Sequence, residues 1–298
     1  MPSLLKLRFD INAGPACAIN RGMINRPDSG FARFVALLIF TGLLAACAGD
    51  SDKDKLPPDE PVEPLYNKAS DLMDDHDYGG AAKAFEEVER QHPYSQWATR
   101  AQLMEAYAQY ENLDYDAASA TLEQFIQLHP GNAEIAYAYY LRALCAYERI
   151  ADVRRDQGYA HNALKALQDV INRFPDTTYA HDAVLKVALV NDHMAGAEME
   201  TGRWYLGQKL YIAAIGRFKT VVEKYQSTSH VPEALERLVE CYISLGINKE
   251  AKATAAVLGY NFPGSEWYQA AYRLLAENNL APEADKDSWI GSVWHSVF

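Results

Sequence analysis

Five segments of this chain end in the same way, and this repetition limits the fold more than any other feature. Each segment is a short apolar stretch that ends at a proline or, in one case, a glutamine. The end positions are Pro93, Pro130, Pro175, Gln226 and Pro263, and an alanine stands twelve residues before each of them, at Ala81, Ala118, Ala163, Ala214 and Ala251. Repetition at intervals of a few tens of residues indicates a solenoid, in which each unit packs against its neighbours.

The residues between each alanine and the following end position have the pattern of an α-helix. Large apolar side chains recur three and four residues apart, as on one helix face, and the alanine lets a second helix pack closely. Proline ends a helix because it lacks the backbone N–H of the next turn. This register resembles the second helix of the tetratricopeptide repeat. We predict an all-α, right-handed superhelical solenoid of about five tetratricopeptide-like repeats over residues 65–278.

The first 46 residues have the features of a signal peptide. Arg26 and Arg33 precede an uncharged apolar run at residues 34–46. This run is too short to cross a bilayer comfortably, which takes about 20 apolar residues. A start at Met23 would by itself give an adequate signal peptide, so we expect the true start there.

The apolar run ends in Leu44-Ala-Ala-Cys47, which resembles the lipobox of bacterial lipoproteins. We expect cleavage after Ala46 and the attachment of an S-diacylglycerol and an N-acyl chain to Cys47, because several acyl chains hold a protein on a membrane stably. Ala48 follows the cysteine instead of Asp, which by resemblance to enterobacterial sorting favours the outer membrane. The alternative is an ordinary signal peptide with Cys47 near the cleavage site by chance.

Two further segments flank the predicted repeats. Residues 47–64 are rich in Asp, Lys, Glu and Pro, a composition typical of a disordered tether. The tail at residues 279–298 has apolar residues at helical spacing, which predicts a short amphipathic helix. These residues are Ile290, Val293, Trp294, Val297 and Phe298. The tail helix either caps the last repeat or docks on a partner.

Nothing in the sequence indicates catalysis or a metal site. It contains no nucleophile elbow, no H-E-x-x-H motif and no phosphate-binding glycine loop. His92 and His129 each precede a repeat-ending proline, where other repeats carry Phe or Tyr, so we expect them to pack and not to bind metal. The net charge of −12 disfavours nucleic acid as a partner. We expect no enzyme activity and no cofactor apart from the lipid on Cys47.

Tyrosine is abundant, with 19 residues, several of them in predicted first helices. First helices line the concave face of tetratricopeptide solenoids, and tyrosine offers a rigid ring and a hydroxyl that suit peptide binding. The candidate peptide groove consists of Tyr107, Tyr110, Tyr137, Tyr140 and Arg142. The alternative is that most of these tyrosines belong to the core between repeats.

The lipobox, the tether and five repeats of this length together resemble the BamD (YfiO/ComL) family of outer-membrane β-barrel assembly lipoproteins. The resemblance covers roughly residues 47–275 and is carried by residues 139–144, the insertion at 154–157, and residues 211–222. It implies a non-catalytic scaffold, anchored by lipid to the periplasmic leaflet of the outer membrane of a Gram-negative bacterium.

The resemblance also implies partners. The C-terminal repeats would bind the POTRA region of BamA, in company with other lipoproteins of the BAM complex. The N-terminal repeats would receive unfolded outer-membrane β-barrel precursors. Arg217 matches the family arginine implicated in the contact with the POTRA region.

Two other functions stay open. One is a periplasmic tetratricopeptide scaffold for cell-wall synthesis or division. The other is a hydrolase that uses the repeats to bind its substrate, which would need clustered acids or metal ligands in the groove.

Overall fold

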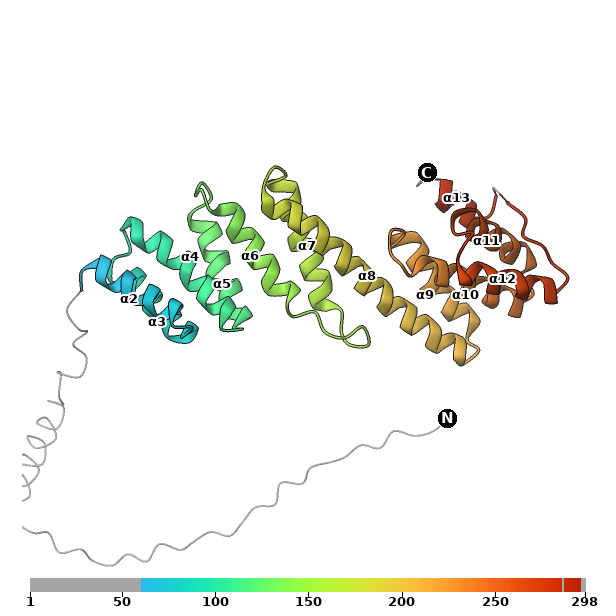
Figure 1. Ribbon diagram of the computed structural model, residues 1–298, viewed down its shortest axis with the longest axis horizontal. Helices are drawn as coiled ribbons and strands as arrows, with labels where there is room; N and C mark the ends of the chain where they lie inside the picture. Colours follow the sequence, from blue (N-terminus) through green and yellow to red (C-terminus); the bar gives the residue numbers. More distant parts are fainter. Residues whose placement is uncertain (1–59, 286, 296–298) are drawn as a thin grey trace, which may run out of the picture. The chain divides into compact units, whose positions relative to one another are not determined.

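The computed structural model describes residues 60–285 and 287–295, and every regular element in that part of the chain is a helix. This confirms the predicted all-α fold, and Figure 1 shows the helices following one another in chain order. The signal peptide, Cys47 and most of the predicted tether lie outside the described residues. The helices are α2 (Val62–Asp74), α3 (Tyr78–Gln91), α4 (Gln96–Glu111), α5 (Tyr115–Leu128), α6 (Ile135–Tyr147), α7 (Gly158–Arg173), α8 (Thr178–Gly207), α9 (Tyr211–Lys224), α10 (Val231–Ser244), α11 (Asn248–Asn261), α12 (Glu266–Glu277) and α13 (Trp289–His295).

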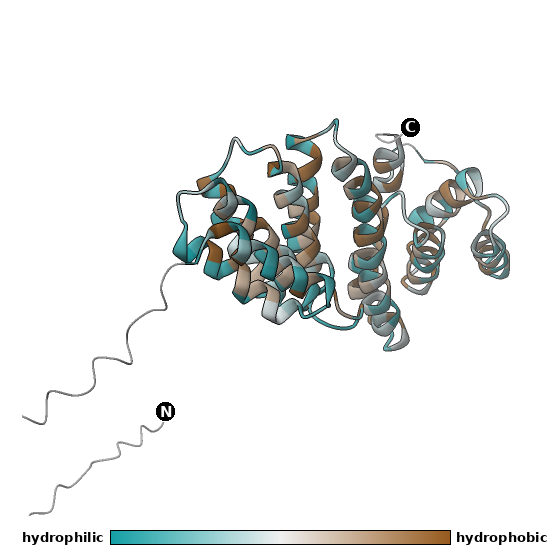
Figure 2. Cartoon of the chain, turned by 60° about the vertical axis from the view of Figure 1, so that its left-hand side comes forward, coloured by the Kyte–Doolittle hydropathy of each residue, from teal (hydrophilic) through white to brown (hydrophobic). Residues whose placement is uncertain are grey.

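The helices form pairs whose core follows the alanine register. Even-numbered helices from α2 to α10 come first in each pair, and each packs against the odd-numbered second helix that follows it. The five register alanines all lie in second helices and are completely buried: Ala81, Ala118, Ala163, Ala214 and Ala251. Large side chains such as Phe85 and Phe218 stand four residues later and are buried as completely. Figure 2 shows hydrophobic and hydrophilic residues on different sides of the helices.

The second helices all end at the same register position, two residues before the repeat-ending residue. The C-cap residue of each donates its backbone N–H to the carbonyl four residues earlier. Helix α9 ends in this way although Gln226, not proline, follows it. Proline therefore reinforces the end of the helix and is not required for it.

A single type of turn follows five of the even-numbered helices, namely α2, α4, α8, α10 and α12. One residue in each turn has a positive φ: His76, Leu113, Lys209, Gly246 and Asn279. The backbone N–H of Leu113 donates to the carbonyl of Tyr110 at 2.9 Å. The backbone N–H of Asp114 donates to the carbonyl of Gln109, also at 2.9 Å. This pair of bonds is the Schellman motif, which satisfies carbonyls at the end of a helix.

The first helix begins earlier than the sequence predicted. Helix α2 starts at Val62, inside the segment assigned to the tether, with Pro61 at its N-cap and Pro64 in its first turn. The N–H groups of a first turn have no partner within the helix, so proline is tolerated there. Leu65 and Tyr66 then bury their side chains against the first repeat.

The third and fourth pairs span more residues than the other pairs. Residues 148–157 form a loop between α6 and α7, and at its end the Gln157 side chain donates to the Arg155 carbonyl at 2.9 Å. Helix α8 has 30 residues, so its C-terminal half extends from the third pair to the fourth.

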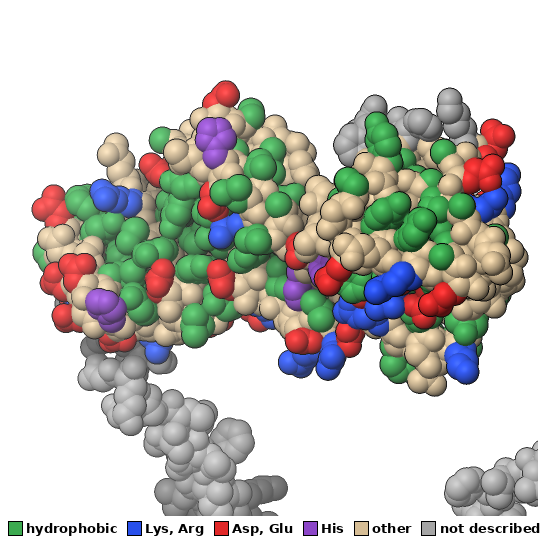
Figure 3. All heavy atoms as spheres, turned by 45° about the vertical axis from the view of Figure 1, so that its right-hand side comes forward, with side chains coloured by type: hydrophobic (Ala, Val, Ile, Leu, Met, Phe, Trp, Pro, Cys, Tyr) green, Lys and Arg blue, Asp and Glu red, His purple; other side chains and the backbone are tan. Residues whose placement is uncertain are grey.

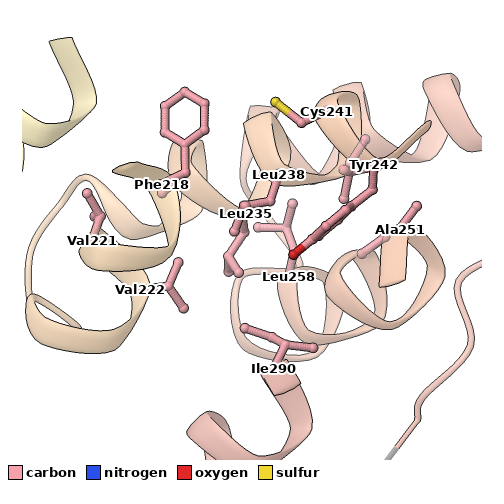
Figure 4. Packing of buried hydrophobic residues seen from close by; sticks show 14 of the residues in the cluster. Phe218, Val221, Val222, Leu235, Leu238, Cys241, Tyr242, Ala251, Leu258 and Ile290 are labelled. Atoms are coloured by element: carbon pink, nitrogen blue, oxygen red, sulfur yellow. The ribbon is translucent and has the colours of Figure 1, made fainter. Parts of the chain in front are cut away.

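The tail packs against the last repeats. Ile290 of α13 is fully buried and lies near Leu258 of α11 (Figure 4). The Lys219 ammonium of α9 lies 4.0 Å from the centre of the Trp289 ring. Before α13, Lys249 pairs with Asp285 at 2.9 Å. Helix α13 thus covers apolar surface at this end of the described solenoid, while Val297 and Phe298 lie outside the described residues.

Candidate functional site

The four tyrosines of the candidate groove lie on two neighbouring first helices, α4 and α6. All four are partly buried. The structure adds a fifth, Tyr179 of α8, whose ring centre lies 5.6 Å from that of Tyr137 and 5.4 Å from that of Tyr140. Tyr179 could have been found from the sequence, because it lies in the next first helix. These five residues form what we call the tyrosine cluster: Tyr107, Tyr110, Tyr137, Tyr140 and Tyr179.

Three hydroxyl groups of the cluster are held in their protonated form by their surroundings. Burial, more than any neighbouring charge, raises the pKa of Tyr110, Tyr137 and Tyr140 well above the usual range. The Tyr140 hydroxyl donates a hydrogen bond to Asp182 of α8. Neutral hydroxyls can donate to a carbonyl and accept from an N–H, so this surface offers both functions to a peptide backbone.

Arg142 lies apart from the tyrosine cluster. Its guanidinium carbon is 5.1 Å from the ring centre of Tyr139, and the side chain lines a groove between α5 and α7 of about 440 Å³. The same groove is lined by Arg149, Lys165 and Asp169. The candidate groove of the sequence is therefore divided between two surfaces of the structure.

The first half of α8 extends the tyrosine cluster with apolar side chains. Leu185 and Leu189 are 65% and 58% exposed. Leu189 lines a cavity of about 310 Å³ together with Tyr147 and Ile150. Exposed large apolar residues beside partly buried aromatic rings are typical of a binding surface. Figure 3 shows hydrophobic side chains gathered over the N-terminal helices on the face that it displays.

The later even-numbered helices carry ion pairs. Glu200 of α8 accepts from Arg154 of the insertion loop at 2.9 Å, and Arg203 donates to Glu233 of α10 at 3.1 Å. Arg237 of α10 donates to Glu240 at 2.9 Å.

Arg217 lies on α9, within the segment that carries the family resemblance. It donates to Glu198 of α8 at 3.1 Å, and the Arg217 side chain is 45% exposed. A half-exposed guanidinium has further N–H groups that can reach a carboxylate outside the chain.

Cys145 and Cys241 are buried free thiols, and burial raises the pKa of each to about 12. Within the described residues, no three His, Cys, Asp or Glu side chains are placed to hold a metal ion. The same part of the chain has no helix that is long and apolar enough to cross a membrane.

Comparison with known proteins finds a family match over most of the described helices. The model of the YfiO family, described as outer membrane lipoprotein, matches residues 58–258. The chain is 50% identical over 252 residues to the outer membrane protein assembly factor BamD of Caulobacter vibrioides, covering 84% of this chain and 83% of the relative. It is 45% identical over 240 residues to the BamD of Rickettsia prowazekii, covering 80% and 95%. The BamD of Neisseria gonorrhoeae is 35% identical over 253 residues, with 80% and 95% covered.

Two solved structures also match at low identity. A thermophilic TPR protein of Thermus thermophilus has 19% identity and a TM-score of 0.34, and the match covers 72% of this chain and 98% of that protein. Pseudomonas aeruginosa pilF has 12% identity and a TM-score of 0.33, with 72% and 97% covered.

Proposed function

This chain belongs to the YfiO family of outer membrane lipoproteins, and from that premise we propose that it acts as an outer membrane protein assembly factor. The observation that carries the proposal is the 50% identity to BamD of Caulobacter vibrioides over 84% of this chain. The YfiO family model matches residues 58–258, a range that includes the tyrosine cluster and Arg217. We propose that the chain is a non-catalytic scaffold.

The tyrosine cluster is the proposed receptor for unfolded β-barrel precursors. Its neutral hydroxyls can bond to the backbone of an extended segment, and its rings can pack against alternate side chains. Leu185 and Leu189 add apolar area for the same segment. A precursor strand that will face lipid carries such apolar side chains at every second position.

The lipid on Cys47 is the proposed membrane anchor. Cleavage after Ala46 would leave this cysteine at the start of the mature chain, acylated and held in the periplasmic leaflet of the outer membrane. Residues 47–61 would then connect the lipid to α2.

Arg217 is the proposed contact to the POTRA region of a BamA-type barrel protein. Charge-assisted bonds between a guanidinium and a carboxylate are short and strong. Glu198 holds the guanidinium from one side, so a partner carboxylate would share Arg217 with an acid of this chain. That arrangement fixes where the side chain points before the partner arrives.

The test is a pull-down of the tagged, lipidated protein from solubilised outer membrane, followed by mass spectrometry and by depletion of the protein in cells. Recovery of a POTRA-containing barrel, and loss of folded barrels on depletion, would support the proposal. Recovery of cell-wall synthesis or division proteins without that barrel would overturn it.

Arg217→Glu should reduce recovery of the POTRA-containing barrel at least tenfold, because it replaces an attraction with a repulsion. Arg273→Glu is the matched control, since Arg273 is an exposed arginine on α12. If both variants recover the POTRA-containing barrel equally, Arg217 is not the contact to the POTRA region. The scaffold function does not depend on this result, because the pull-down and the depletion test it separately.

A further inference from the structure

Gly216 lies in the middle of α9, and nothing in the fold requires a glycine there. Glycine weakens a helix interior relative to alanine. A Cβ at Gly216 would meet no atom within 4 Å, and its φ is not positive. At Gly202 and Gly259, in contrast, a Cβ would lie 2.5 Å and 2.6 Å from an aromatic ring. Packing explains those two glycines and does not explain Gly216.

Gly216 is exposed, and the surface along α9 is most open on its N-terminal side. Ile212, one turn earlier, is 79% exposed. Thr220, one turn later, donates its hydroxyl to the Gly216 carbonyl at 3.0 Å, so its polar group is engaged within the helix. We call the strip formed by the exposed Ile212 and Gly216 and the partly buried Thr220 the α9 face.

Positive charge borders the α9 face in an otherwise acidic chain. Residues 209–224 contain four basic residues and one acidic residue, whereas the whole chain has a net charge of −12. Arg217 stands one residue and Lys219 three residues after Gly216, and they pair with Glu198 and Glu223. An acidic partner would be attracted to this helix and repelled by the chain as a whole, which would direct it to α9.

We propose that the α9 face docks an acidic segment of the partner that Arg217 contacts, and that the missing side chain at Gly216 lets the partner's backbone approach the helix closely. A glycine permits such an approach because no Cβ holds the two backbones apart. The exposed Ile212 supplies apolar contact beside it. This inference rests on the proposed function, because it takes the POTRA region as the occupant.

The experiment measures binding of the purified POTRA region, from the barrel protein of the same organism, to the full lipidated chain in detergent. The variants are Gly216→Ala and Gly216→Gln. The controls are Gly207→Ala and Gly207→Gln, since a Cβ at Gly207 would also meet nothing within 4 Å. We expect Gly216→Gln to weaken binding at least tenfold and Gly216→Ala severalfold. The midpoint of thermal unfolding should stay level or rise, since both new residues favour helix.

The outcomes separate this inference from the function on which it rests. Weaker binding together with a level or higher unfolding midpoint supports close approach at Gly216. Wild-type affinity for Gly216→Gln, with weak binding of Arg217→Glu, overturns the docking of a backbone on the α9 face and leaves the Arg217 contact in place. If Gly216→Gln and Arg217→Glu both bind with wild-type affinity, the docking on the α9 face and the Arg217 contact are both overturned.

Discussion

At the scale of single residues, Gly202 shows how tightly α8 packs on α9. A Cβ at this position would lie 2.5 Å from the ring of Phe218, which is fully buried. We expect Gly202→Ala to lower the free energy of unfolding by about 1–3 kcal/mol through overpacking. This loss should outweigh the gain of about 1 kcal/mol from alanine's helix propensity.

Chemical denaturation would measure that loss, with Gly207→Ala as the control. The Gly207 site is open, so its variant should be as stable as the wild type or slightly more stable. If Gly202→Ala were as stable as Gly207→Ala, the close contact between Gly202 and Phe218 would be wrong.

A buried acid should make the stability depend on pH. Burial, followed by repulsion from Glu86 and Glu89, raises the pKa of Glu105 from 4.5 to about 7. The folded state therefore favours the protonated carboxyl, and stability falls as pH rises from the unfolded pKa through the folded one. Glu105→Gln should stabilise the chain by about 1–3 kcal/mol at pH 8 and by much less at pH 5. Thermal unfolding at the two pH values would check this, and an equal effect at both would exclude the raised pKa.

At the scale of elements, the Schellman turns carry strain that glycine would relieve. Leu113 adopts a φ of 63° and is exposed, so it loses little packing if replaced. We expect Leu113→Gly to stabilise the chain by about 0.5–1 kcal/mol, because glycine has no Cβ to clash in the left-handed region. Gly246→Ala, in the equivalent turn, should destabilise it by about the same amount. Urea unfolding of the two variants should therefore shift in opposite directions, and a shift in the same direction would contradict the turn geometry.

The sequence shows which face of a second helix is buried more clearly than which face of a first helix, and the reason is physical. A second helix such as α5 buries one face, so the spacing of Ala118, Leu122 and Phe125 reveals which side is inside. Helix α6 has apolar residues all around it and contacts helices on several sides. Periodicity cannot then tell which face a residue occupies, so Arg142 was grouped with tyrosines from which the structure separates it.

At the scale of the whole solenoid, a destabilising substitution should loosen only the repeats that lie next to it. Most helix contacts join elements that are adjacent in the chain, so each pair depends mainly on its neighbours. Ile290→Asp should detach α13, because a charge would replace a fully buried side chain. Hydrogen exchange should then rise in α9, α11 and α13 and stay unchanged in α3. Ser292→Asp, at an exposed position of the same helix, is the control, and a rise in α3 would show that the solenoid unfolds as one unit.

The dependence of each pair on its neighbours also affects how the chain acquires its structure. Contacts that are close in sequence form quickly, because little chain entropy is lost in closing each short loop. The pairs α2–α3 and α4–α5 can therefore settle before α10 and α11 have met. Helix α13 contacts α9 and α11, so it can dock only after these two helices have formed. Folding of this solenoid should run from many local starting points, and the closure of its C-terminal repeats by α13 should follow the assembly of α9 to α11.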